Sequence, residues 1–283
     1  MTRFTRLFAL LLALAALALV GCGGDDGDDA ATNGTDTTET TEEAALETVT
    51  EGQLTVGSDI PFPPFEFREG GELTGFDVEL VEEIASRLGL EVEWVPTDFD
   101  TIFTQLAGGR FDMVASATTI TEEREQIVNF SEPYYRAQQA LIVNSELSGD
   151  IQGVADVGEG DVVAVQRGTT GEAWARETFE PQGAEIRSFP QAPDTYIALE
   201  GGTVQAVIFD EPSAVEEAST RPVLQVVEAI DTGEDYGLGV NPANEPLLDA
   251  VNDALAEMVE DGTYQQIYET WFPDAPAGSV ADG

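Results

Sequence analysis

The sequence predicts an α/β fold with two lobes, each a mostly parallel sheet flanked by helices. Strand-like and helix-like hydrophobic patterns alternate through residues 54–115, in the order strand, helix, strand, helix, strand. The same alternation returns over residues 162–209. Such alternation is typical of parallel sheets covered by helices, and its repetition predicts a second lobe. Two further apolar strands, 138–143 and 236–240, are the candidate crossings between the lobes.

The spacing of apolar residues places the elements of the first repeat. Residues 54–57 form a short apolar strand. Apolar residues every four positions from Phe76 to Leu88 predict a helix that ends at Gly89. The remaining elements are a strand at 92–95, a short helix at 102–106 and a strand at 113–115.

The second repeat and the C-terminal region have the same character. A strand at 162–165 is followed by a helix from Gly171 and by a strand at 204–209. Two amphipathic helices, 247–260 and 264–271, then close the predicted fold.

Composition excludes several classes of function. The chain has 55 acidic and 11 basic residues, no His and a net charge of −44. All basic residues are Arg, so no lysine is available for a Schiff base or a phosphate-binding loop. A basic surface for nucleic acid or anionic lipid cannot form. Without His, and with one Cys, a zinc site or a Ser-His or Cys-His nucleophile is excluded. We therefore expect neither a metal nor a cofactor.

The N-terminal region is typical of an export signal followed by a tether. Residues 1–21 combine two arginines with a short apolar run, as in a signal peptide; a buried helix is the alternative. Residues 19–22 resemble the lipobox of bacterial and haloarchaeal lipoproteins, which implies acylation of Cys22. Residues 22–51 are acidic and rich in Thr, which predicts a disordered tether, and residues 274–283 predict a flexible tail.

Polar and aromatic residues follow the ends of the predicted strands, where open α/β sheets bind their ligands. The candidate binding residues are Asp59, Phe62, Phe99, Ser116, Ala117, Thr119, Arg124, Gln166, Thr169, Thr170 and Asp210.

The chemistry of these residues suits a zwitterion. Thr169, with Glu172 three residues later, predicts a capping box whose neighbouring backbone N–H groups favour an anion. Arg124 lies in the first turn of a helix, where a cation needs a carboxylate partner. Asp59 and Asp210 suit a cation.

Each candidate also has a structural interpretation. Arg124 could pair on the surface with Glu122 or Glu123, and the two aspartates could cap strand ends. The aromatic residues Phe62 and Phe99 could belong to the core, and the capping box could be only a cap. Their common location at strand ends favours a binding site.

Four stretches, 56–67, 73–80, 120–131 and 262–272, resemble the family 3 extracellular solute-binding proteins, the polar amino-acid receptors of ABC importers. The resemblance covers residues 52–273. It implies a periplasmic-binding-protein-like fold (type II) with two crossing strands as a hinge. Lobe 1 would be discontinuous (52–137 and 234–273), and lobe 2 would comprise residues 138–233.

The resemblance also implies roles for the candidate residues. Arg124 would hold the ligand α-carboxylate, helped by Thr119 and the backbone near Ala117, and from the other lobe by Thr169 and Thr170. Asp210 would accept from the α-ammonium group.

The remaining roles concern the ligand side chain. Phe62 and Phe99 would sandwich it, and Asp59 would meet its far end. Some basic-amino-acid receptors have Ser in place of Ala117. Gln166 stands where glutamine-binding members often have Lys, and Asp59 favours arginine or lysine.

We therefore expect an exported, monomeric, non-enzymatic lipoprotein that is attached to the cell membrane through Cys22 and faces the outside or the periplasm. It would deliver a free, preferentially basic, amino acid to the permease subunits of an ABC importer. An enzyme like cyclohexadienyl dehydratase, with Glu211 as its acid or base, is one alternative. A sensory or adhesive surface module is another.

Overall fold

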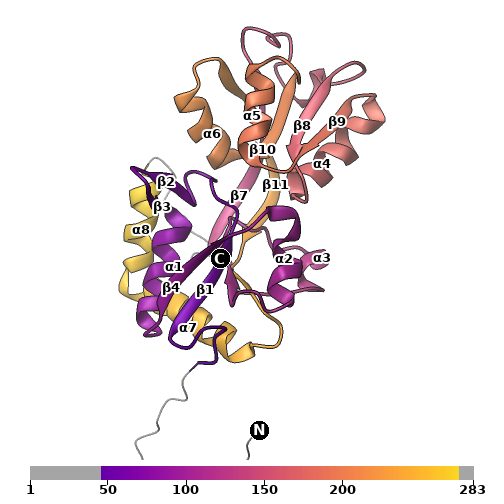
Figure 1. Ribbon diagram of the computed structural model, residues 1–283. Helices are drawn as coiled ribbons and strands as arrows, with labels where there is room; N and C mark the ends of the chain where they lie inside the picture. Colours follow the sequence, from indigo (N-terminus) through magenta and orange to yellow (C-terminus); the bar gives the residue numbers. More distant parts are fainter. Residues whose placement is uncertain (1–45, 274–283) are drawn as a thin grey trace, which may run out of the picture. The chain divides into compact units, whose positions relative to one another are not determined.

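The computed structural model describes residues 46–273 (Figure 1). The predicted signal segment, Cys22 and the tail lie outside the described residues. The tether was predicted to extend to residue 51, but its last residues belong to the fold. The backbone N–H of Val49 donates to Asp112 (2.7 Å), and Asn244 donates to the carbonyl of Glu47 (2.8 Å). Within the described range, no helix has the length and apolar character needed to cross a membrane.

The first sheet has five strands in the order β4-β1-β5-β12-β6. They are β1 (Gln53–Ser58), β4 (Glu91–Pro96), β5 (Met113–Val114), β6 (Asn129–Phe130) and β12 (Gly239–Val240). The first three run parallel, whereas β12 and β6 pair antiparallel. The sheet is therefore mixed, with a parallel part on one side, and it takes β12 from a distant part of the chain.

Helices cover both faces of this sheet and complete the first lobe. They are α1 (Phe76–Arg87), α2 (Phe99–Ala107), α3 (Glu122–Glu125), α7 (Glu245–Asp261) and α8 (Thr263–Trp271), with a hairpin of β2 (Phe67–Glu69) and β3 (Glu72–Thr74). The predicted stripe on α1 is buried among residues of α7 and α8, whereas Ile102 and Leu106 of α2 belong to a separate cluster. Figure 1 shows α1 and α2 on opposite sides of the strands. As predicted, α1 ends before Gly89, whose φ is +69°.

The second sheet repeats this design in the order β11-β7-β10-β8-β9. Its strands are β7 (Tyr135–Asn144), β8 (Val162–Gln166), β9 (Glu185–Phe189), β10 (Ala206–Asp210) and β11 (Leu224–Tyr236). The helices of this second lobe are α4 (Thr170–Phe179), α5 (Ala192–Glu200) and α6 (Glu211–Thr220), with 3₁₀ turns at Val154–Asp156 and Glu180–Gln182. Strands β10, β8 and β9 are parallel, and β7 is antiparallel to both of its neighbours, β10 and β11.

The two crossings are β7 and β11, which lie side by side and link the two lobes (Figure 1). Their pairing extends from Asn144 and Leu224 to Tyr135 and Tyr236. The second crossing was predicted at 236–240, but β11 ends at Tyr236 and residues 239–240 form β12 of the first sheet. The predicted segment is apolar, so hydrophobicity alone did not distinguish a crossing from a sheet strand.

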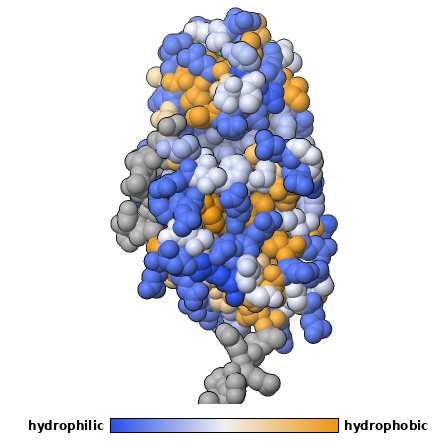
Figure 2. All heavy atoms as spheres, turned by 90° about the vertical axis from the view of Figure 1, so that its left-hand side faces the viewer, coloured by the Kyte–Doolittle hydropathy of each residue, from blue (hydrophilic) through white to orange (hydrophobic). Residues whose placement is uncertain are grey.

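The described surface is largely polar on the face shown in Figure 2, with smaller apolar areas between hydrophilic side chains. This agrees with a composition in which acidic residues greatly outnumber basic ones.

Candidate functional site

All eleven candidate residues line one cavity. The first lobe contributes Asp59, Phe62, Phe99, Ser116, Ala117, Thr119 and Arg124, and the second contributes Gln166, Thr169, Thr170 and Asp210. The cavity therefore lies between the lobes, beyond the carboxyl ends of β1, β5, β8 and β10. The structure brings the candidates together, and their contacts with a ligand stay a prediction.

Arg124 is the buried cation of the cavity, with 7% of the residue exposed. Its guanidinium donates to the carbonyl oxygens of Thr119 (2.7 Å) and Gly168 (3.2 Å). The guanidinium carbon lies 5.3 and 4.8 Å from the ring centres of Phe99 and Phe103. Among the described residues, no carboxylate oxygen lies within 4.0 Å of it. The alternative of a surface ion pair is therefore wrong.

The short helix α3 places this side chain. Thr121 caps the helix by accepting from the backbone N–H of Arg124 (3.2 Å). Burial lowers the pKa of Arg124, and the nearby carboxylates of Asp210 and Glu234 oppose that effect. A buried guanidinium with donors to spare is suited to a carboxylate ligand, which it can bind through two parallel hydrogen bonds.

Asp210 provides the acidic counterpart at the end of β10. It stands at the N-cap position of α6, but its side chain makes no capping hydrogen bond. Its carboxyl group accepts instead from the hydroxyl of Tyr236 (2.6 Å) and from the amide of Gln139. Burial and the negative charge of Glu234 raise the pKa of Asp210 to about 7, although both hydrogen bonds and Arg124 lower it. A bound cation would therefore favour the ionised form.

Asp59 follows β1 and accepts from the amide of Gln166 in the second lobe (2.5 Å). Burial raises the pKa of Asp59 to about 6, with a smaller contribution from the carboxylates of Asp98 and Asp100. The hydrogen bond from Gln166 acts in the opposite direction. This carboxyl group thus combines an amide donor with a local excess of negative charge.

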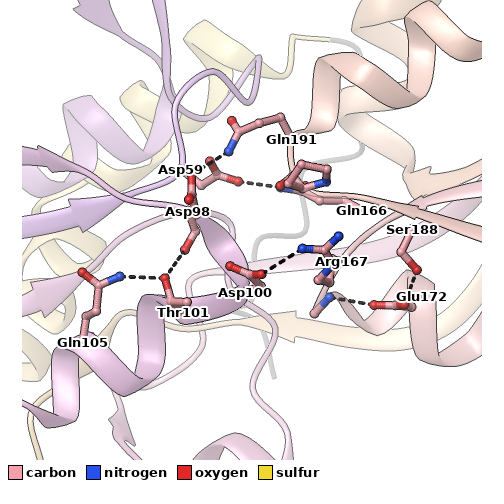
Figure 3. Close-up of polar contacts among 12 residues, drawn as sticks. Asp59, Asp98, Asp100, Thr101, Gln105, Gln166, Arg167, Glu172, Ser188 and Gln191 are labelled. Atoms are coloured by element: carbon pink, nitrogen blue, oxygen red, sulfur yellow. Dashed lines mark hydrogen bonds and ion pairs between the residues drawn. The ribbon is translucent and has the colours of Figure 1, made fainter.

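Two further contacts cross between the lobes near Asp59 (Figure 3). Gln191 donates to Asp98 (2.8 Å), and Arg167 pairs with Asp100 (3.4 Å). We call these two contacts the rim pairs. In each of the three contacts the first lobe supplies the carboxylate and the second lobe supplies the donor.

The capping box predicted at the start of α4 is present in a modified form. Thr169 accepts from the backbone N–H of Glu172 (3.1 Å), and Glu172 accepts from Gly168 (2.7 Å) instead of Thr169. Arg176 and Ser188 hold the Glu172 carboxylate on its other side. The loop at the second-lobe side of the cavity is thereby fixed from both ends.

Two buried carboxyl groups support the first-lobe side of the cavity, and the sequence analysis did not identify them. Ser116 accepts from the backbone N–H of Asp59 (3.0 Å) and donates to Glu66 (2.7 Å). Asp77 accepts from the backbone N–H of Ala117 (2.9 Å), a residue with a φ of +46°. Burial raises the pKa of Asp77 to about 6 and that of Glu66 well above its usual range.

The candidate aromatic residues are partly core residues. The ring centre of Phe62 lies 5.9 Å from that of Phe65 and 5.4 Å from that of Phe209, so Phe62 packs against both lobes. Phe99 is 8% exposed and contacts Phe103 edge to face. Both rings also line the cavity.

The residues that sequence reasoning missed lie mainly on the crossing strands. Gln139 of β7, and Glu234 and Tyr236 of β11, bond directly to cavity residues. These three residues lie within the crossing strands, whereas the sequence-based candidates all lie at or just beyond strand ends. A charged residue next to an apolar crossing segment, such as Glu234, is a sequence feature that could have indicated these residues.

Comparison with known proteins gives consistent similarities. The chain is 36% identical over 233 residues to the L-cystine-binding protein TcyJ of Escherichia coli (strain K12), covering 81% of this chain and 86% of the relative. An ancestral arginine-binding protein bound to arginine superposes with a TM-score of 0.74 at 39% identity, covering 78% of this chain and 99% of that chain.

A third similar structure is that of the ancestral amino-acid-binding protein AncCDT-1, described as a precursor of cyclohexadienyl dehydratase. Its TM-score is 0.73 at 38% identity, covering 78% of this chain and 96% of that chain. Residues 54–274 match the family of bacterial extracellular solute-binding proteins, family 3. That range contains both crossings, nearly all of both sheets and every residue of the cavity. The chain therefore belongs to family 3 of the bacterial extracellular solute-binding proteins.

Proposed function

We propose that this protein is the receptor of an ABC importer and binds one free amino acid between its lobes. The observation that carries the proposal is the buried guanidinium of Arg124, which has no acidic partner among the described residues and shares a cavity with Asp210. A buried guanidinium without an ion pair is costly, so a carboxylate that pairs with it gains a strong, charge-assisted contact. An α-amino acid supplies that carboxylate together with a cation for Asp210.

Binding of this kind stabilises the closed arrangement of the lobes. Arg124 lies in the first lobe and Asp210 in the second, so a ligand that contacts both links them. A ligand shifts the equilibrium between open and closed forms by its difference in affinity for the two. The permease would then receive the closed, loaded receptor.

We assign a basic side chain to the ligand because of Asp59. A cationic group can replace the hydrogen bond from Gln166 and gain a charge interaction, whereas an acidic side chain would meet Asp59, Asp98 and Asp100. Relatives of this chain are described as binding cystine and arginine. Both ligands carry the same α-carboxylate and α-ammonium groups.

Thermal unfolding in the presence of each common amino acid tests the proposal. A ligand at 100 times its dissociation constant stabilises a protein by about 2.7 kcal/mol. For a chain of this size the midpoint should rise by roughly 5–10 °C. If no amino acid raises the midpoint, the proposal fails; if glutamate raises it more than arginine and lysine, the assignment of a basic ligand fails.

An enzymatic function has one supporting observation, the similarity to a dehydratase precursor. Its candidate acid or base, Glu211, is not among the residues that line the cavity. Incubating the protein with prephenate and measuring how much is consumed distinguishes the two functions, because an enzyme would convert it whereas a receptor leaves it unchanged.

We also propose that the exported chain acts as a monomer attached to the membrane through an acylated Cys22. The expected result of Cys22→Ser is release of the protein from the membrane fraction with unchanged amino-acid affinity. Retention of the variant in membranes would contradict this attachment.

A further inference from the structure

Glu234 is a buried carboxylate directly behind the lining of the cavity, where it bonds Thr119 and Thr170, and the functional roles proposed so far do not use it. It lies on β11, where it pairs with Ala137 of β7, and it is 7% exposed. One of its oxygens, Oε2, accepts from the hydroxyls of Thr119 (2.8 Å) and Thr170 (2.9 Å). The first threonine belongs to the first lobe and the second to the second lobe. Glu234 thus joins both lobes to a crossing strand.

The other oxygen of Glu234 is also occupied. Oε1 accepts from the hydroxyl of Thr232 (2.9 Å) and from the amide of Gln139 (3.1 Å). The same amide donates to Asp210, so the two carboxylates are linked through Gln139. The negative charge of Glu234 acts on both Asp210 and Arg124.

The hydrogen-bond donors of the two threonines are therefore committed. A hydroxyl group has one proton and two lone pairs, and an ionised carboxylate only accepts. With both protons given to Glu234, neither hydroxyl donates to the other across the 3.5 Å between their oxygens, and each oxygen keeps only lone pairs. In this arrangement the hydroxyls can accept from a ligand N–H but cannot donate to a ligand carboxylate.

We propose that Glu234 is a positioning residue that makes the Thr119 and Thr170 hydroxyls acceptors for the α-ammonium group of the ligand. This inference rests on the proposed function, and it assigns the two hydroxyls to the ammonium group, whereas the family resemblance implied that these threonines help to bind the carboxylate. The carboxylate is then left to Arg124 and backbone N–H groups, while the ammonium group, which has three donors, meets Asp210 and the two hydroxyl oxygens. The negative charge behind the hydroxyls strengthens their attraction for a cation.

The test compares Glu234→Gln with the unchanged protein, using three probes in calorimetric titrations of the full chain. L-arginine carries both charged groups, agmatine lacks the carboxylate, and 5-guanidinopentanoate lacks the α-ammonium group. Loss of a hydrogen-bond network to a charged group predicts affinities about tenfold lower for arginine and for agmatine. The affinity for 5-guanidinopentanoate should change by less than about twofold.

The matched control is Asp235→Asn, which removes the same charge from the next residue of β11. Asp235 pairs with the exposed Arg136 on the surface. This control should leave all three affinities within about twofold. A general loss of stability in Glu234→Gln would lower the affinity of all probes alike, which the comparison among probes distinguishes from the proposed role.

A second variant keeps the proposal testable if Glu234→Gln folds poorly. Thr170→Val removes one accepting hydroxyl at nearly constant volume and should show the same pattern on a smaller scale. If 5-guanidinopentanoate loses as much affinity as agmatine in either variant, the hydroxyls serve the carboxylate and the inference is wrong.

Amino-acid binding by the unchanged protein distinguishes failure of the proposed function from failure of the role of Glu234. If it binds no amino acid, the proposed function fails. If it binds arginine but the variants show no selective loss, only the role of Glu234 fails. If another amino acid binds better, its own decarboxylated and deaminated analogues replace the three probes, because the head group is common to all amino acids.

Discussion

The two polar parts of the cavity are built differently. In the first, Glu234 and Gln139 link Thr119, Thr170 and Asp210, and Arg124 donates to the carbonyl of Thr119. We call Thr119, Arg124, Thr170 and Asp210 the Arg124 cluster. In the second, Asp59 has one side-chain donor within residues 46–273, Gln166, and lies beside the rim pairs (Figure 3). The Arg124 cluster is anchored in a crossing strand, whereas the contacts around Asp59 join the ends of β1 and β8 and the start of α2.

This difference suggests a division of tasks. A densely bonded cluster holds its groups in one geometry, which suits the head group common to all amino acids. The pair of Gln166 and Asp59 has few other side-chain contacts, so substitutions at these two positions can change the preferred ligand without disturbing the rest of the cavity. We therefore expect mutations in the Arg124 cluster to affect every ligand, and mutations around Asp59 to affect the choice among ligands.

Arg124→Ala should have the largest effect. Removal of one partner of a buried charged pair costs about 3–5 kcal/mol, so the affinity for every amino acid should fall at least about 100-fold. Isothermal titration calorimetry measures this directly. Arg136→Ala is the control because its side chain is 72% exposed and pairs only with Asp235 among the described residues, and it should bind normally. If Arg124→Ala binds amino acids normally, the Arg124 cluster does not bind the head group common to all of them.

Acidification should weaken binding through Asp210. Its carboxyl has a pKa of about 7 in the ligand-free protein, and a bound ammonium group lowers that pKa. Binding then requires ionisation, so the affinity is full above the free-state pKa and falls as the pH drops below it. We expect about a tenfold loss between pH 8 and pH 6.

The proton released on binding provides a second measurement. Titrations at pH 7 in buffers of different ionisation enthalpy should show release of about half a proton from Asp210. Asp210→Asn should bind weakly and lose most of this pH dependence. Constant affinity of the unchanged protein from pH 8 to pH 6 would contradict the assignment of the ammonium group to Asp210.

Asp59→Asn should alter selectivity more than overall binding. The amide oxygen of the substituted side chain still accepts from Gln166, but the charge is lost. The affinity for arginine should fall about tenfold, and the affinity for glutamine should stay within about twofold. Competition titrations measure the ratio of the affinities for arginine and glutamine. Asp253→Asn on α7 is the charge-matched control, because Asp253 does not line the cavity. Equal losses for both ligands would show that Asp59 does not read the side chain.

Sequence patterns predicted most of the parallel core because its signals are local. The stripe on α1, its end before Gly89 and the strands β1 and β8 follow from spacing and turn chemistry. Strand β9 and the helices α5 and α6 were not identified, since α5 and α6 are weakly amphipathic. The second crossing was misplaced because two neighbouring segments serve different sheets.

The residues that line the cavity were predicted more completely than the buried residues that hold them in place. Strand ends converge by topology, so one rule indicated the segments that hold all eleven lining residues. The family resemblance added binding roles for residues such as Ala117 and Gln166. Glu234, Glu66 and Asp77 escaped that rule because they act from behind the cavity, through contacts between residues far apart in sequence. The bond between Ser116 and Glu66, for example, joins residues 50 positions apart. No local pattern encodes such a contact.

Loss of the rim pair of Arg167 and Asp100 should have the smallest effect on ligand affinity. Its side chains are 50% and 26% exposed, and exposed ion pairs contribute about 0–1 kcal/mol. In a double-mutant cycle of Arg167→Ala and Asp100→Asn, affinity for arginine should change by about twofold or less at low salt. The coupling should vanish at about 1 M NaCl, where the screening length is about 3 Å. A tenfold loss that persists at high salt would mean that the rim itself holds the lobes together, and the two parts of the cavity would then be alike in strength.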